Sequence, residues 1–185
     1  MFPHNIIVMK VGPHSGMSLE EIIQSKRDEE LIHGVHYWGY SGTMCQPRPT
    51  RKFCCECLHD SHEAPSLILI ETKSAYQTDQ IGMIRFYSED GNNFVSFPGP
   101  VQLQGAKFAF VSKSLHIIDD FRLSDYMVVG GKNNGKPLST HLRGRVGKAF
   151  AHFFQGAFET PPSPPIRVLA AELCSPYAVW LKEEV

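Results

Sequence analysis

The chain has 185 residues, of which 42% are hydrophobic and 11% aromatic. This composition excludes a disordered or collagen-like chain and indicates one packed domain, because two independent cores would have little room. Lys and Arg number 18 against 19 Asp and Glu, giving a formal net charge of −1. That balance argues against a protein whose whole surface is cationic, as in generic nucleic-acid or membrane binders.

The N-terminus and the cysteines bear on the cellular compartment. Residues 1–10 have neither the basic start nor the long apolar run of a secretory leader, and no stretch is long and apolar enough to predict a transmembrane helix. The cysteines are odd in number and mostly crowded together, unlike a disulfide framework. They are Cys45, Cys54, Cys55, Cys57 and Cys174. We therefore expect a cytoplasmic protein in a reducing environment.

Short apolar or alternating runs, bounded by Gly, Pro, Asn and Ser, predict several strands. The clearest turn signal is Glu89-Asp90-Gly91-Asn92-Asn93, which is typical of a hairpin. The predicted strands are, in chain order, 5–11, 35–40, 67–70, 81–88, 94–97, 107–111, 126–129 and 166–173. Because the strands come in runs instead of alternating with helices, we predict an α+β fold with a mainly antiparallel sheet.

Two principal helices are predicted. Ser18 and Glu21 form a capping box, and Gly34 is a natural stop, which predicts a helix over about 18–33. A second helix is predicted over about 138–154 from apolar residues at helical spacing. These apolar residues are Leu142, Val146, Ala149, Phe150 and Phe153.

Two segments of unusual composition interrupt the predicted elements. A polar, Cys-rich insertion runs over about 43–65, and a Pro-rich segment at 160–165 is typical of a stiff connector. The sequence contains no internal repeat. We predict a single domain over 1–185.

The most informative stretch for function is the glycine-rich segment between residues 128 and 137. Residues 130–136 match the G-x-x-x-x-G-K part of a phosphate-binding P-loop. Pro137, however, stands where a P-loop has the Ser or Thr that binds magnesium, and too little chain follows for the rest of such a fold. The segment is therefore not predicted to be a P-loop enzyme.

A glycine loop of this kind can still bind an anion through its backbone N–H groups. Gly and Asn tolerate positive φ angles, so their amides can turn toward a phosphate. A helix that starts after Pro137 would add its N-terminal partial charge. The candidate phosphate contacts are Gly131, Lys132, Gly135, Lys136, Ser139 and Thr140. The competing interpretation is an ordinary solvated turn.

The predicted second helix adds positive charge beside this loop. On a helix, His141, Arg145, Lys148 and His152 would share one stripe. Residues 126–158 contain five Lys or Arg and no Asp or Glu, so the rest of the chain carries a net charge of −6. His141 and Arg145 are therefore candidate ligand contacts. Alternatively, the basic face only balances acidic neighbours in the fold.

An aromatic cluster, Tyr37, Trp38 and Tyr40, follows the first predicted helix. Tyr and Trp rings can stack on a nucleotide base, which makes these residues candidates for base binding. The competing interpretation, which burial statistics favour, is that Trp38 and one tyrosine are core residues.

The cysteine cluster contains a C-x-x-C pair with histidines behind it, a set of donors that zinc accepts. The candidate ligands are Cys45, Cys54, Cys57, His59 and His62. A second pair with matching spacing is missing, which favours free thiols on a loop over a bound zinc. We therefore predict no cofactor, with zinc as the alternative.

These features favour a non-catalytic, cytoplasmic binding protein for a small phosphate-bearing ligand, such as a nucleotide or a nucleotide-derived signal. One alternative is a metal-assisted hydrolase or nuclease acting on phosphate esters through the Cys/His cluster, although no catalytic residue is identified. Another is an interaction protein that docks its basic helix on an acidic partner. No membrane partner is predicted, and self-association into a homo-oligomer is left open.

Overall fold

The computed structural model describes residues 2–12, 17–73, 83–103, 105–144, 146–154 and 162–183. The chain divides into two compact units. Unit 1 comprises Met1–Val11, Cys55–Glu71 and Ser114–Glu172, and unit 2 comprises Gly12–Cys54, Thr72–Lys113 and Leu173–Val185. Of the Pro-rich connector, residues 160 and 161 lie outside the described residues, and 162–165 have no regular secondary structure.

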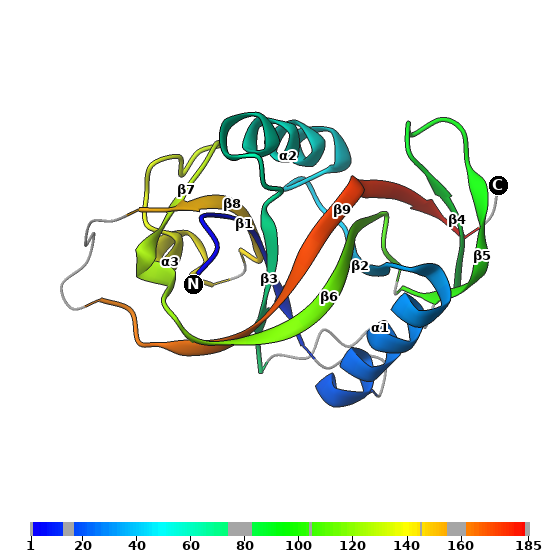
Figure 1. Ribbon diagram of the computed structural model, residues 1–185, viewed down its shortest axis with the longest axis horizontal. Helices are drawn as coiled ribbons and strands as arrows, with labels where there is room; N and C mark the ends of the chain where they lie inside the picture. The colour runs from blue at the N-terminus through cyan, green and yellow to red at the C-terminus, as the bar shows by residue number, and fades with distance from the viewer. Residues whose placement is uncertain are drawn as a thin grey trace. The chain divides into compact units, whose positions relative to one another are not determined.

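Strands dominate the described part of the chain (Figure 1). They are β1 (Asn5–Val11), β2 (His36–Tyr40), β3 (Ser66–Glu71), β4 (Met83–Ser88), β5 (Val95–Gln102), β6 (Phe108–Phe121), β7 (Tyr126–Val128), β8 (Lys148–Phe153) and β9 (Ile166–Lys182). The helices are α1 (Leu19–His33), α2 (Pro47–Ser61), α3 (Leu138–His141) and a 3₁₀ turn, η1 (Leu123–Asp125). None of the helices described is long and apolar enough to cross a membrane.

In unit 1 the strands follow the order β7-β8-β1-β3-β9, and the central pair is parallel. Ile6 of β1 lies opposite Ser66 of β3, and the register continues to Val11 opposite Glu71. The prediction of a mainly antiparallel sheet is therefore wrong: the sheet is mixed. The physical reason is that β1 and β3 are continuous apolar runs, buried on both faces, which is typical of parallel central strands.

The predicted helix over 138–154 is also wrong. Only α3, a single turn, is helical, and residues 148–153 form β8, which pairs with β1 and β7. Gly144 adopts a left-handed φ of 70°, which ends any helical course there. Ala149 and Ala151 are buried, while Phe150 and His152, which alternate with them, are partly exposed, so the true period of this segment is two.

The core of unit 1 is built from the inward side chains of its strands and of α3, together with Leu142 just after α3. Tyr126 is buried within it and donates a hydrogen bond from its hydroxyl to the Pro3 carbonyl, 2.6 Å away. The buried members are Ile6, Val8, Ile68, Ile70, Phe121, Tyr126, Val128, Leu138, Leu142, Ala149, Ala151, Val168 and Ala170. This core fixes both ends of the segment between β7 and β8.

The polar segment expected over 43–65 is largely the helix α2, not a loop. A proline in its first turn is tolerated because the N–H that proline lacks would have no intrahelical partner there. Thr50, Phe53, Cys54 and Cys57 are buried at helical spacing. Cys54 and Cys57 therefore belong to the apolar face of a helix.

Unit 2 contains α1, the antiparallel pair β2–β6, and the β4–β5 hairpin, of which β4 also pairs with the end of β9. The hairpin prediction is confirmed: Asp90 accepts hydrogen bonds from the N–H groups of Asn92 and Asn93 in the turn. The buried core of unit 2 consists of Tyr37, Ile84, Phe97, Val101, Leu103, Ala106, Ala109, Val111, Val179 and Leu181.

The first predicted helix is confirmed as α1. The Ser18 side chain accepts from the Glu21 N–H, and Gly34 closes the helix in the left-handed conformation with φ of 77°. The Glu29 carboxylate accepts the Tyr37 N–H of β2 at 2.6 Å. A side chain of α1 thus satisfies a backbone donor of β2 that β6 does not use.

Candidate functional site

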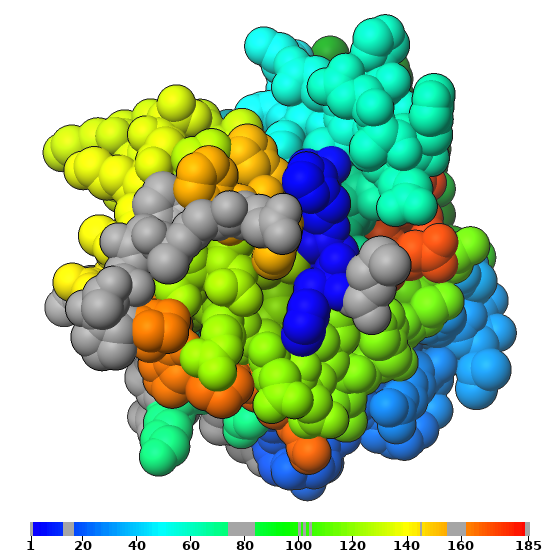
Figure 2. Space-filling view, turned by 60° about the vertical axis from the view of Figure 1, so that its left-hand side comes forward, coloured from blue at the N-terminus to red at the C-terminus, as the bar shows by residue number. Residues whose placement is uncertain are grey.

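The glycine loop, residues 129–137 of unit 1, leaves β7 and returns beside it. Two hydrogen bonds close its base: the Val128 N–H donates to the Lys136 carbonyl and the Gly135 N–H to the Val128 carbonyl, each at 2.9 Å. An isolated bridge between Met127 and Pro137 follows. The ends of the loop are therefore held at the edge of the sheet, and most of its residues are exposed at the surface (yellow-green in Figure 2).

Three glycines of the loop adopt backbone conformations that other residues rarely adopt. The φ angles are 81° at Gly130, 72° at Gly131 and 82° at Gly135. A Cβ atom at any of the three would meet no heavy atom within 4 Å. The backbone conformation, and not crowding, therefore requires glycine at these positions.

Some backbone N–H groups of the loop are used internally and others are not. The Gly130 N–H donates to Asn134 Oδ1 at 2.7 Å, and the Lys136 N–H donates to the Asn133 carbonyl at 3.0 Å. Within the described ranges, the consecutive N–H groups of Gly131, Lys132 and Asn133 have no acceptor. The tip of the loop thus presents three adjacent backbone donors to its surroundings.

A buried histidine supports the loop from below. His141 is 8% exposed, and its Nε2 lies 3.0 Å from the Lys148 carbonyl, so Nε2 carries the hydrogen. Its Nδ1 is then the acceptor for the Asn133 side-chain amide at 2.8 Å. His141 thereby links the loop to β8. Its role in the structure is to position the loop.

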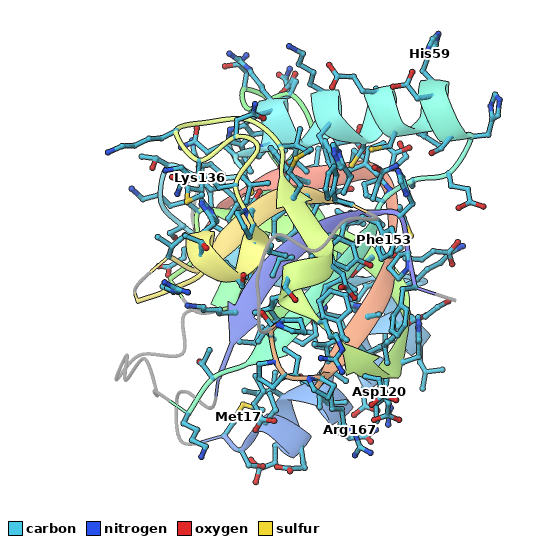
Figure 3. All side chains as sticks on the ribbon, turned by 90° about the vertical axis from the view of Figure 1, so that its left-hand side faces the viewer. Met17, His59, Asp120, Lys136, Phe153 and Arg167 are labelled. Carbon is cyan, nitrogen blue, oxygen red and sulfur yellow. The ribbon has the colours of Figure 1, made fainter. Side chains whose placement is uncertain are left out.

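The cationic side chains around the loop differ in their availability. Lys132, Lys136 and Arg143 are exposed, and Lys136 is labelled in Figure 3. Lys10 is committed elsewhere, because its Nζ donates to the carbonyls of Leu142, at 2.5 Å, and Gly144, at 3.1 Å. Burial lowers the pKa of Lys10.

The basic stripe expected on a second helix does not exist. His141 belongs to α3, whereas Lys148 and His152 belong to β8, and Arg145 lies outside the described residues. Ser139 and Thr140 lie within the single turn of α3. Because this helix has only four residues, it contributes no appreciable macrodipole to the loop.

The aromatic residues proposed for base stacking are buried in unit 2. Tyr37, Trp38 and Tyr40 are 9%, 3% and 6% exposed. Tyr37 packs edge-on against Phe97, and Tyr40 stacks on Phe110 with ring centroids 4.2 Å apart. Burial raises the pKa of Tyr37 to about 12. Their contacts are those of core residues, and no face of these rings is offered to a ligand at the surface.

The candidate zinc ligands are not gathered around one point. Cys45, Cys54 and Cys57 are buried, whereas His59 and His62 are exposed, and His59 points away from α2 in Figure 3. Over the described ranges, no group of three or more His, Cys, Asp or Glu side chains could hold a metal ion. The donor set therefore does not fit zinc.

A buried ionisable pair in unit 2 was not anticipated from the sequence. Lys26 and Glu29 of α1 are 4% and 5% exposed, with Lys26 Nζ 3.4 Å from Glu29 Oε2. Burial raises the pKa of Glu29 and lowers that of Lys26. Charged residues at this spacing usually lie on a solvated helix face, so the sequence offers no signal for their burial.

Comparison of the chain with protein-family models, with curated proteins and with solved structures found no match.

Proposed function

We propose that this chain is a non-catalytic binding protein for a small phosphate-bearing ligand, and that the glycine loop is its phosphate site. The observation that carries the proposal is the run of three adjacent N–H groups, Gly131 to Asn133, without an acceptor in the described structure. Phosphate oxygens accept several hydrogen bonds at once, and consecutive backbone donors in a glycine-rich turn suit them.

The charge around the loop supports an anionic ligand. Lys132 lies within the run of free donors and Lys136 follows it by three residues, and both are exposed. Arg143 is exposed on the segment that follows α3. The sequence from 126 to 158 contains no carboxylate that would compete for these cations. A one-signed cluster of this kind attracts phosphates and is not required for folding.

The way the loop is held supports binding with little reorganisation. Its base is closed by two backbone hydrogen bonds, and its tip is attached through Asn133 to the buried His141. A loop fixed in this way loses less conformational entropy when a ligand binds. The proposal specifies a phosphate group only. A nucleotide is one ligand class that carries it, and no base-stacking residue is assigned.

A thermal-shift titration tests the proposal. Pyrophosphate and a panel of nucleotides, each well above its Kd, are expected to raise the Tm of the wild-type protein by about 5–10 °C. The double variant Lys132→Ala/Lys136→Ala should lose most of this shift. Lys113→Ala, which removes an exposed cation from β6 in unit 2, is the matched control and should retain it.

The proposal fails if pyrophosphate and every nucleotide leave the Tm unchanged. It also fails if the loop variant and the Lys113 control lose the shift equally, because the binding would then be nonspecific attraction of anions to surface charge.

A further inference from the structure

Three buried side-chain atoms on the pair β2–β6 in unit 2 have no hydrogen-bond partner in the described structure: His36 Nε2, Trp38 Nε1 and Ser112 Oγ. His36 and Ser112 are fully buried, and Trp38 is 3% exposed. Buried polar groups are almost always paired, with protein or with a bound molecule, because an unpaired one carries its full cost of desolvation. Three such atoms together therefore indicate a partner that is not a protein side chain.

The three side chains belong to the same face of the strand pair. His36 lies opposite Ser112 in the register, so their Cβ atoms are neighbours. Trp38 follows His36 by two residues and therefore points to the same side of β2. The two rings are nearly perpendicular, with centroids 6.0 Å apart. The three side chains that carry the unpartnered atoms thus share one face of the strand pair, which we call the β2–β6 polar site.

The hydrogen-bonding character of each atom can be assigned. His36 Nδ1 lies 3.0 Å from Glu30 Oε2, and because a carboxylate accepts, Nδ1 carries the hydrogen. Burial lowers the pKa of His36, which favours the neutral ring and makes Nε2 an acceptor. Trp38 Nε1 is a donor only, whereas the Ser112 hydroxyl both donates and accepts.

These donor and acceptor assignments limit which molecules the site can bind. A fully deprotonated anion has no hydrogen to donate to His36 Nε2. A metal cation would face the Trp38 N–H, with the Lys26 ammonium also close, 5.5 Å from the indole ring centre. A neutral hydroxyl group meets both needs, since it accepts from Trp38 and donates to His36.

We propose that the β2–β6 polar site binds one small neutral hydroxylic molecule, hydrogen-bonded to His36 Nε2, Trp38 Nε1 and Ser112 Oγ. Water and a small alcohol share this chemistry. This proposal does not depend on the glycine loop. If the β2–β6 polar site proves empty, the phosphate-site proposal is unaffected.

NMR of the indole N–H groups tests occupancy directly. The chain has two tryptophans, so the Trp38 signal can be assigned by comparison with Trp180→Phe. A long-lived bound hydroxyl should give a cross-relaxation peak of slow-tumbling sign between water and Trp38 Hε1, and Ser112→Val should abolish it. Absence of this peak in water and in dilute methanol would overturn the proposal.

Dilute methanol separates the two sources of the hydroxyl. A contact between the methanol methyl group and Trp38 Hε1 assigns the site to small alcohols. Persistence of the water peak alone assigns it to water. Either result supports a hydroxylic occupant.

The Tm of Ser112→Ala gives a second test, because an occupied site and an empty site predict different changes in Tm. If Ser112 binds the guest, its truncation should lower the Tm by about 2–4 °C. If the hydroxyl is truly unpaired, removing it should leave the Tm unchanged or raise it, which would contradict the proposal. Ser96→Ala, an exposed serine on β5 of the same unit, is the matched control and should not change the Tm.

Discussion

Individual buried polar residues, more than any sequence motif, determine how the candidate sites are organised. His141 is the main example in unit 1, because each of its ring nitrogens is engaged, one by Asn133 of the glycine loop and one by the Lys148 carbonyl. The glycine-rich pattern identified the loop, but nothing in the pattern indicated that a histidine after it would support it.

Replacing His141 with Ala should loosen the glycine loop. The change leaves the Asn133 amide and the Lys148 carbonyl without their partner, which should lower the free energy of unfolding by about 1–3 kcal/mol. Hydrogen exchange should become faster at the loop amides, as mass spectrometry of loop peptides would show. His59→Ala is the control, since the His59 side chain is 88% exposed. Equal exchange in the two variants would show that His141 does not hold the loop.

His36 should make the stability of the protein depend on pH. Burial lowers the pKa of His36, so in the folded protein the ring resists protonation while in the unfolded chain it protonates near its usual value of about 6.5. The unfolded state therefore binds more protons, and the stability that His36 contributes is lost as the pH falls below about 6.5. His152, whose pKa burial also lowers, acts in the same direction.

The measurement is the urea midpoint at about pH 7.5 and about pH 5.5. The decrease on acidification should be smaller in His36→Gln, which keeps a polar side chain but does not titrate. If the wild-type protein and the variant lose stability equally between the two pH values, His36 is not the titrating group.

At the scale of elements, α1 is attached to β2 through buried charge. Glu29 accepts from both Lys26 and the Tyr37 N–H, so one carboxylate neutralises a buried ammonium and satisfies a strand donor. Glu29→Ala should therefore cost about 3–5 kcal/mol, because Lys26 would remain buried without a counter-charge. Chemical denaturation measures this loss. Asp28→Ala, the exposed neighbour on the same helix, should be nearly neutral, and a similar cost for both would refute the role of Glu29.

The α2 cysteines should differ sharply in reactivity. Cys55 is exposed, whereas Cys54 and Cys57 are buried on the inner face of the helix, and burial raises the pKa of Cys57 to about 11. A thiol reagent at about pH 7.5 should modify Cys55 rapidly and the two buried thiols only after unfolding, because the thiolate is the reactive form. Mass spectrometry of the modified peptides assigns the sites. Rapid labelling of Cys54 or Cys57 in the native protein would show that α2 is not packed as described.

Elements with local signals were predictable, and elements that depend on tertiary context were not. The cap at Ser18 and the stop at Gly34 bound α1 as expected, because these interactions lie within the helix itself. The Asp90 turn was likewise predictable from its own residues. By contrast, the parallel pairing of β1 with β3 joins residues far apart in the sequence, and no local pattern specifies it.

The two misassigned segments show why residue spacing alone was insufficient. The segment 148–153 is too short for its apolar spacing to distinguish a helical period of 3.6 from a strand period of 2. The left-handed conformation of Gly144 ends the helical course before this segment, which then forms a strand. In α2, the spacing of Cys54 and Cys57 suits both a metal site and a buried helix face. The interpretation of Cys54 and Cys57 as metal ligands on a loop therefore missed the helix in which they lie.

At the scale of the whole molecule, the net charge of −1 conceals an uneven distribution. Residues 126–158 carry five basic and no acidic residues, and the remainder carries 13 basic and 19 acidic residues. Among the described residues of this basic set, Lys132, Lys136 and Arg143 are exposed, and they lie on or after the glycine loop in unit 1. A nearly neutral chain can therefore have one local cationic site, whose affinity for anions should weaken as the salt concentration rises.

The most direct test of this site is a backbone amide NMR titration with pyrophosphate at low salt. The phosphate-site proposal predicts that the largest shifts occur at the amides of Gly131, Lys132 and Asn133, that they saturate, and that Lys132→Ala/Lys136→Ala abolishes them. Shifts spread over exposed cations throughout the chain, or no saturable shift at the three loop amides, would contradict it.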